Sequence, residues 1–126
     1  LRGLCGENDM RAVHALADAG NSEAALALEM YCYRARKYIG AYGAVLGRVD
    51  ALVFTAGIGE HDAAVRERVL AGLECFGVRL DAARNRACRH DRAQAIHAAA
   101  SRVAILVIPT NEELEIAREV SALVAG

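Results

Sequence analysis

The residues best suited to chemistry lie between positions 51 and 62, where glycines follow an apolar run. Ala51–Phe54 has the character of a short buried strand, and Gly57 and Gly59 lie in a predicted loop, Thr55–Glu60. A helix is predicted to begin at about Asp62. Glycines at such a junction can take positive φ and allow a ligand to approach, while the N–H groups of a helix N-terminus attract phosphate. The pattern therefore indicates phosphate binding, although a Gly-x-Gly pair can equally form a simple turn.

A second group of charged residues, Asp9 and Arg11, follows Asn8 near the N-terminus. Asn8 is predicted to cap a helix that runs to about Ala19 and stops at Gly20, with Asp9 favourably placed at its positive end. From the residues alone, these side chains are helix-capping groups as readily as ligand-binding groups.

A third group lies at the start of a predicted final helix, about Asn111–Val124. Thr110 and Glu113 have the Ser/Thr-x-x-Glu spacing of a capping box. Glu112, next to them, is either an acid stabilised by the helix dipole or a carboxylate available to a metal ion.

The remaining cysteines, histidines and arginines are not grouped. A zinc site from Cys75, Cys88, His90 and His97 would lack the close paired spacing of structural zinc sites, so we do not expect one. No cysteines form a Cys-x-x-Cys pair, which is typical of reduced thiols in a cytosolic protein. The arginines of the polar stretch 81–102 are expected at the surface.

The elements that must position these groups predict an α/β fold. A long helix is expected from about position 21 to 46, ended by Gly47, and its many apolar residues predict that little of it lies in water. Val103–Ile108 is typical of a strand in a parallel sheet, and Val78–Leu80 could form a short edge strand. Two buried strands, each followed by a polar loop and a helix, place sites at their carboxyl ends. They also require neighbouring strands that these residues do not supply.

Length, composition and net charge limit the kinds of partner that the chain can have. With 126 residues, of which 55% are hydrophobic, the chain can bury the core of one domain. A net charge of −1 argues against nucleic acid or an anionic membrane surface as a partner. No apolar run approaches the ~20 residues that a membrane-spanning helix needs.

Three segments together resemble the acetate kinases, the short-chain carboxylate kinases of the sugar-kinase/Hsp70/actin superfamily. Positions 53–61 read Val-Phe-Thr-Ala-Gly-Ile-Gly-Glu-His, close to that family's Phe-Thr-Gly-Gly-Ile-Gly-Glu-Asn. Positions 8–11, Asn-Asp-Met-Arg, resemble its Ser-x-Asp-Met/Phe-Arg segment, and positions 107–114, Val-Ile-Pro-Thr-Asn-Glu-Glu-Leu, resemble its C-terminal signature. The order of these motifs predicts that residues 1–126 are the C-terminal nucleotide-binding part of such an enzyme, with the N-terminal part absent.

The resemblance implies the C-terminal part of an actin-like/ribonuclease H-like ATPase domain, a partial sheet with packed helices. It also implies transfer of a phosphoryl group from ATP to acetate, giving acetyl phosphate and ADP, with Mg²⁺, by a cytoplasmic homodimer. The residues that it implies for nucleotide binding are Asp9, Met10, Arg11, Gly57, Ile58, Gly59, Glu60 and His61, and the residue that it implies for magnesium is Glu112.

Two positions depart from the family pattern. Ala56 stands where glycine is frequent, which requires this position to avoid positive φ, and His61 stands where asparagine is usual. The acetate-side groups of the family have no match here, so we assign no catalytic residue and expect no kinase activity from these residues alone. A propionate kinase and a non-catalytic nucleotide-binding module are alternatives at this point.

Overall fold

Within the described residues, the sheet has three strands, and two of them are parallel. The computed structural model describes residues 1–89 and 91–124, apart from the side chains of Glu112 and Glu113. The strands are β1 (Ala51–Phe54), β2 (Gln94–Ala95) and β3 (Ala104–Val107), in the order β1-β3-β2. β1 pairs in parallel with β3, which confirms the predicted parallel arrangement, and β2 pairs antiparallel with β3.

The N-terminal helices are α1 (Arg2–Cys5), α2 (Met10–Asp18) and α3 (Ser22–Leu46). The bounds of the long helix are confirmed: Asn21 accepts a hydrogen bond from the backbone N–H of Ala24, and Gly47 ends the helix with φ of 69°. The cap of α2 differs from the prediction, because Asp9 rather than Asn8 accepts the bond from the N–H of Arg11.

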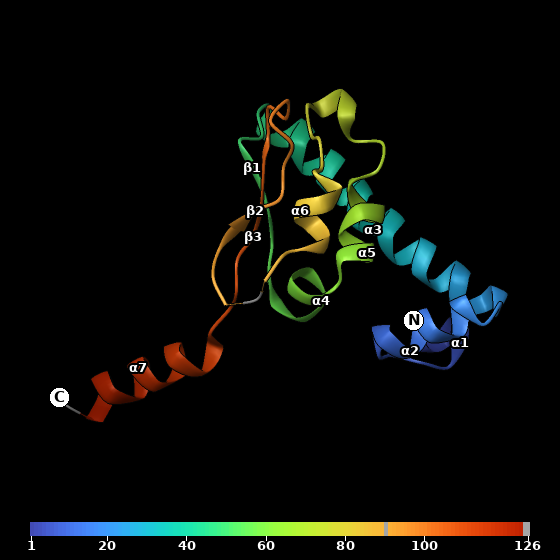
Figure 1. The fold of residues 1–126 in the computed structure, drawn as a ribbon. Helices are drawn as coiled ribbons and strands as arrows, with labels where there is room; N and C mark the ends of the chain where they lie inside the picture. The colour runs from blue at the N-terminus through green and yellow to red at the C-terminus, as the bar shows by residue number, and fades with distance from the viewer. Residues whose placement is uncertain (90, 125–126) are drawn as a thin grey trace.

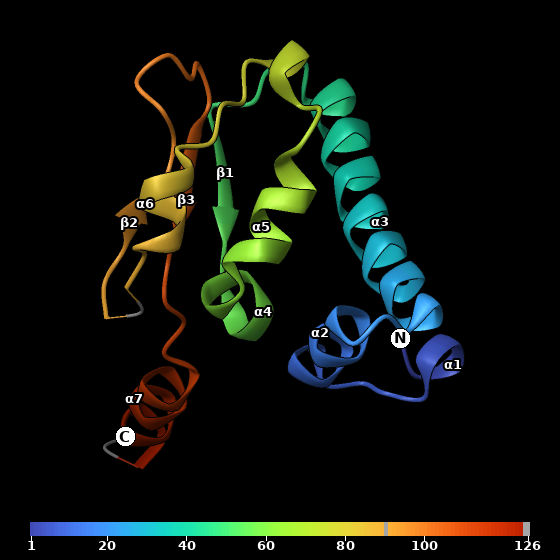
Figure 2. The ribbon, with the colours of Figure 1, turned by 45° about the vertical axis from the view of Figure 1, so that its right-hand side comes forward.

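The remaining helices are α4 (Ala56–His61), α5 (Ala63–Leu70), the 3₁₀ turn η1 (Glu74–Phe76), α6 (Ala82–Arg86) and α7 (Glu112–Val124). Figure 2 shows α5 between β1 and α3, so this helix links the sheet to the helical layer. In Figures 1 and 2, α7 extends away from the sheet, beyond the carboxyl end of β3.

Two apolar clusters hold these elements together. One joins α2, α3 and α5 and contains Met10, Val13, Ala24, Leu28, Cys32, Val65 and Val69. The other lies against the sheet and contains Leu70, Leu73, Val78, Ile96, Val103, Ile105 and Val107. Because α5 contributes to both clusters, its position fixes the segment that precedes it, α4, against both layers.

Several expectations about burial and strands are wrong. Val53 is 51% exposed, because β1 lies at the edge of a small sheet, and Val45 near the end of α3 is 83% exposed. Val78–Leu80 forms only a single bridge, between Leu80 and His97, while β2 was not predicted because it has two residues and no apolar pattern. In the described part of the chain, no helix is both long and apolar enough to cross a membrane.

Candidate functional site

The segments after β1 and β3 lie at the same edge of the sheet. The two strands are parallel, so their carboxyl ends coincide, and hydrogen bonds join the segments that leave these ends. The N–H of Ile108 donates to the carbonyl of Phe54 at 2.9 Å, and the hydroxyl of Thr55 donates to the carbonyl of Ile108 at 2.9 Å. Polar segments far apart in the sequence are thus held side by side.

The glycine segment differs from its prediction in both shape and backbone angles. The expected loop Thr55–Glu60 is largely the short helix α4, and neither Gly57 nor Gly59 has positive φ. Instead, Ala56 carries the positive φ, 57°, so the prediction that this position avoids the left-handed region is wrong. The residue with positive φ is thus the first residue of α4, one position before Gly57.

The two glycines of α4 differ in what surrounds them. A Cβ on Gly59 would lie 3.4 Å from the backbone carbon of Phe54, in van der Waals contact, so α4 packs closely against the end of β1 and leaves no space for a larger side chain there. A Cβ on Gly57 would meet nothing within 4 Å. Gly57 therefore leaves open space beside the helix.

That open space belongs to a pocket of about 410 Å³, which we call the α2–α4 pocket. It is lined by two segments that are distant in the sequence: Asn8, Asp9, Met10 and Arg11 at the start of α2, and Gly57, Ile58, His61 and Asp62 around α4. Six of the eight predicted nucleotide-binding residues line it, and Gly59 and Glu60 do not. The structure thus brings together the two segments that the resemblance paired.

The lining combines an apolar face with charges. Met10 is buried and Ile58 is half-buried, whereas Asp9 and Arg11 are exposed. The guanidinium of Arg11 donates to both carboxylate oxygens of Asp9, at 3.1 and 2.7 Å, and this contact lowers the pKa of Asp9 from 3.8 to about 2. A planar apolar group fits the first face, and an anionic group fits beside Arg11.

The N-terminus of α5 is not a free phosphate site, in contrast to the sequence prediction. Asp62 caps this helix, and its Oδ1 accepts the N–H of Val65 at 2.8 Å. The other carboxylate oxygen, Oδ2, lies 2.8 Å from Nε2 of His14 in α2. A carboxylate therefore already occupies the positive end of α5.

Glu60 points away from the α2–α4 pocket. Its carboxylate is buried and accepts two bonds from Thr110, from the backbone N–H at 2.9 Å and from the hydroxyl at 2.8 Å. These bonds hold the pKa of Glu60 below its ordinary value, against the opposing effect of burial. Glu60 thus connects α4 to the turn after β3, and Thr110 is not the predicted cap of α7. Asn111 takes that role, accepting the N–H of Leu114 at 3.0 Å.

A buried arginine, which the sequence pattern did not reveal, holds α4 in place through hydrogen bonds to its backbone. Arg66 in α5 is 1% exposed and donates to the carbonyls of Gly59 and Glu60 at 2.9 and 2.7 Å. It also donates to the side-chain and backbone oxygens of Asn85 at 2.8 and 3.0 Å. Because Arg66 lies beside apolar neighbours in a helix that also carries exposed charges, its type alone gave no signal that it was buried.

Glu112 is the residue predicted to bind magnesium. Glu112 begins α7, but its side chain lies outside the described residues, as does that of Glu113. Among the residues that the structure describes, no group of three or more histidine, cysteine or acidic side chains could hold a metal ion. His90, weighed above for zinc, is outside the described residues.

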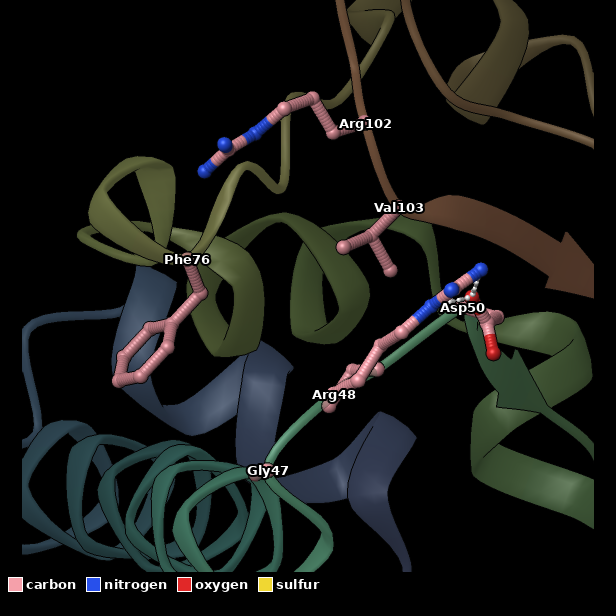
Figure 3. A pocket seen from close by; sticks show the side chains of 8 residues that line it. Gly47, Arg48, Asp50, Phe76, Arg102 and Val103 are labelled. Carbon is pink, nitrogen blue, oxygen red and sulfur yellow. Dashed lines mark hydrogen bonds and ion pairs between the residues drawn. The ribbon is translucent and has the colours of Figure 1, made fainter.

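A second pocket, of about 480 Å³, lies at the opposite end of the sheet, where β1 and β3 begin. We call it the α3–β1 pocket. Figure 3 shows the ion pair of Arg48 with Asp50 on one side of it and Phe76 on the other. Both charged side chains of the pair are mostly exposed, and no residue of the three motifs lies there.

Comparison with known proteins agrees with the motif resemblance. Residues 1–118 match the model of the acetokinase family. The chain is 57% identical to acetate kinase from Nitratidesulfovibrio vulgaris strain Hildenborough, over 100% of this chain and 31% of that protein, and 55% identical to acetate kinase from Sulfurovum sp., over 99% and 32%.

Two solved structures share the fold. Acetate kinase from Porphyromonas gingivalis is 38% identical with a TM-score of 0.86, over 98% of this chain and 31% of that one. A propionate kinase from Francisella tularensis is 41% identical with a TM-score of 0.82, over 94% and 29%. The chain therefore spans about a third of the length of the relatives it matches. These matches do not support the expectation that this third is the C-terminal one.

Proposed function

Because the chain belongs to the acetokinase family, we propose that it is the nucleotide-binding part of a carboxylate kinase that phosphorylates acetate from ATP. The observation that carries the proposal is the α2–α4 pocket, where two motifs of the family resemblance form opposite walls. We propose further that these residues belong to an actin-like ATPase domain, which is completed by other residues of a protein as long as the relatives. We also propose that the complete enzyme is a homodimer in the cytoplasm.

In this proposal each wall of the pocket has a distinct task. Met10 and Ile58 offer an apolar face for the nucleotide base, and Arg11 and His61 supply hydrogen-bond donors to its polar groups. Gly57 keeps the pocket open where a phosphate chain would pass. Positioning and charge neutralisation are the main contributions that a protein makes to phosphoryl transfer.

Magnesium is the cofactor that the family implies, and Glu112 is the residue that we propose for it. Carboxylate oxygens are the ligands that Mg²⁺ prefers, and α7 begins just after Thr110, which is bonded to α4. When bound, the ion would neutralise charge on the phosphate oxygens. This chain's own contribution is to hold the start of α7 beside the glycine segment through Glu60.

Titration with ADP, with these 126 residues carried in a complete protein of the length of their relatives, tests the nucleotide site. We expect saturable binding that is weakened at least tenfold by Arg11→Ala combined with Gly57→Val, since both lining contacts change. The matched control is Arg48→Ala in the α3–β1 pocket, which should bind ADP as the unchanged chain does. Equal binding by all three proteins, or none by the unchanged chain, would disprove the nucleotide site.

A chimera tests the catalytic proposal. We would replace the matching segment of the Nitratidesulfovibrio vulgaris acetate kinase, 57% identical, with these 126 residues and assay acetyl phosphate formation. We expect activity that depends on ATP, acetate and Mg²⁺. A folded chimera that binds ADP but forms no acetyl phosphate would contradict the assignment as part of an acetate kinase.

The same chimera tests Glu112. Losing metal-assisted charge neutralisation can cost several kcal/mol in the transition state, whereas losing a helix-dipole contact costs under about 1 kcal/mol. We therefore expect Glu112→Ala to lower kcat strongly and to shift the dependence on free Mg²⁺ to higher concentrations. Glu113→Ala, which removes the neighbouring acid in the first turn of α7, is the control: it should change stability by under about 1 kcal/mol and leave kcat and the magnesium curve unmoved. A Glu112→Ala enzyme with an unmoved magnesium curve would overturn the metal role.

Propionate is a second candidate substrate, since one similar structure is a propionate kinase. The chimera cannot show which carboxylate is preferred, because its carboxylate pocket would come from the other protein. The assay therefore has to use a complete protein that contains these residues. A higher kcat/KM for propionate would move the proposal to that substrate.

A further inference from the structure

We infer that His14 and Asp62 form a clamp between the two walls of the α2–α4 pocket, and that His14 is a positioning residue for the bound nucleotide. This inference rests on the proposed function, since it concerns the same pocket. It adds a residue that none of the three motifs contains and that does not line the pocket.

The contact joins the two walls directly. Nε2 of His14 in α2 lies 2.8 Å from Oδ2 of Asp62, at the junction of α4 and α5. A carboxylate only accepts hydrogen bonds, so Nε2 carries the hydrogen and donates it. His14 lies one helical turn after Met10 and Arg11, and Asp62 follows His61 in the chain. The bond therefore ties the residues of one wall to those of the other.

Asp62 is fixed by other contacts, so it can hold His14 in place. Its Oδ1 caps α5 through the N–H of Val65 at 2.8 Å, which leaves Oδ2 for the histidine. The two side chains are 24% and 17% exposed, so solvent competes only partly for the bond. The charge of Asp62 is also close enough to α3 to help raise the pKa of Tyr31 and Cys32, for both of which burial is the larger cause.

Apolar packing also holds the two walls together, but it fixes the distance between them less strictly than a hydrogen bond does. Met10 and Val13 of α2 share a cluster with Val65 of α5, and Ile58 packs against that cluster. Such contacts have no preferred direction, whereas a hydrogen bond weakens steeply when its angle or length changes. The His14–Asp62 hydrogen bond runs from α2 to the α4–α5 segment and so adds a directional contact to this packing. The pocket opening should therefore depend on it.

The experiment compares ADP affinity and melting temperature for three variants of these 126 residues, carried in the chimera described above; the unchanged chain is that chimera without a substitution. His14→Leu removes the donor and keeps apolar bulk, and we expect its Kd for ADP to rise about threefold to tenfold. His14→Gln should restore affinity, because its amide nitrogen can reach about as far as Nε2 of histidine. Ser101→Ala is the matched structural control: it removes bonds to Gly77 and Val103 at the far end of the sheet. It should lower the melting temperature without changing the Kd.

The outcomes separate this inference from the function on which it rests. If the unchanged chain binds ADP and His14→Leu binds it equally well, the clamp is wrong while the nucleotide site stands. If Ser101→Ala weakens binding as much as His14→Leu does, the effect is general destabilisation and the positioning role is overturned. If the unchanged chain does not bind ADP at all, the proposed function fails first.

Discussion

The two ends of the β1–β3 pair carry pockets of similar size but different construction. At the carboxyl ends, α4 is held by the buried residues Glu60 and Arg66, whose side chains hydrogen-bond to Thr110, to backbone carbonyls of α4 and to Asn85. At the amino ends, the pocket is bordered by the exposed pair Arg48–Asp50 and by Phe76, which is 49% exposed. A pocket of about 410 or 480 Å³ is therefore not evidence of a site by itself. What distinguishes the α2–α4 pocket as a candidate site is that buried hydrogen bonds of Glu60 and Arg66 hold α4, which forms one of its walls.

The largest effect should come from the buried arginine at the carboxyl end. Arg66→Met leaves the carbonyls of Gly59 and Glu60 and the oxygens of Asn85 without donors, so we expect the free energy of unfolding to fall by about 3 kcal/mol. Arg102→Met, at the amino end, changes an exposed side chain and should cost under about 0.5 kcal/mol. Urea denaturation measures both. Equal losses would mean that the two ends are supported alike.

The next effect separates the two glycines of α4. Gly57→Val places a side chain in the open pocket and should raise the Kd for ADP about tenfold, with a change in stability under about 1 kcal/mol. Gly59→Val presses on the backbone of Phe54 and should lower both affinity and stability. Calorimetric titration together with thermal melting distinguishes them. If Gly57→Val melts as low as Gly59→Val, then the space beside Gly57 is not a pocket in solution.

A smaller effect concerns Glu60 and pH. Its pKa is lower in the folded chain than in the unfolded chain, so it stabilises the fold above the unfolded pKa of 4.5. That stabilisation is lost as the pH falls through the lower, folded pKa. Glu60→Gln should therefore make unfolding free energy less dependent on pH in this acidic range. An unchanged pH slope would show that the bonds from Thr110 do not favour the charged form.

The smallest effect lies at the exposed rim of the α2–α4 pocket. Arg11→Met removes the partner that lowers the pKa of Asp9 to about 2, so NMR titration should show that pKa rising toward 3.8. Stability should barely change, because exposed ion pairs contribute little. Arg48→Met breaks the comparable pair at the other end of the sheet and should leave Asp9 unmoved. A shift of Asp9 in that control would point to a general change of charge rather than the local contact.

The sequence predicted the parallel strands and long helices well, because their signals are local and strong. Gly47 and Asn21 mark the ends of α3 by their types, and the apolar run of β3 needs no context. The two strands of the parallel pair also put the segments after them at one edge, as expected from the order of elements. The strand β2 could not be found this way, because two residues without apolar alternation have no pattern of their own.

The site was predicted as a set of residues but not as a set of roles. Motif resemblance named Glu60 and Gly59 with the pocket residues, and only the structure shows that one binds Thr110 and the other packs on Phe54. Ala56 shows the limit of reasoning from propensity, since a residue with a side chain took the positive φ while two glycines stayed helical. Arg66 and His14 were missed because their roles depend on partners distant in the sequence.

The hydrogen bonds from Thr110 to Glu60 span 50 positions and depend on the parallel pairing of β1 with β3. Closing a loop of this length costs chain entropy before any contact compensates, and non-local pairing of this kind slows folding. Helices α2 and α3, which follow one another in the chain and pack on each other, can form earlier. The edge that carries the α2–α4 pocket should thus be among the last parts to reach its final shape. A ligand bound there would act mainly by slowing unfolding.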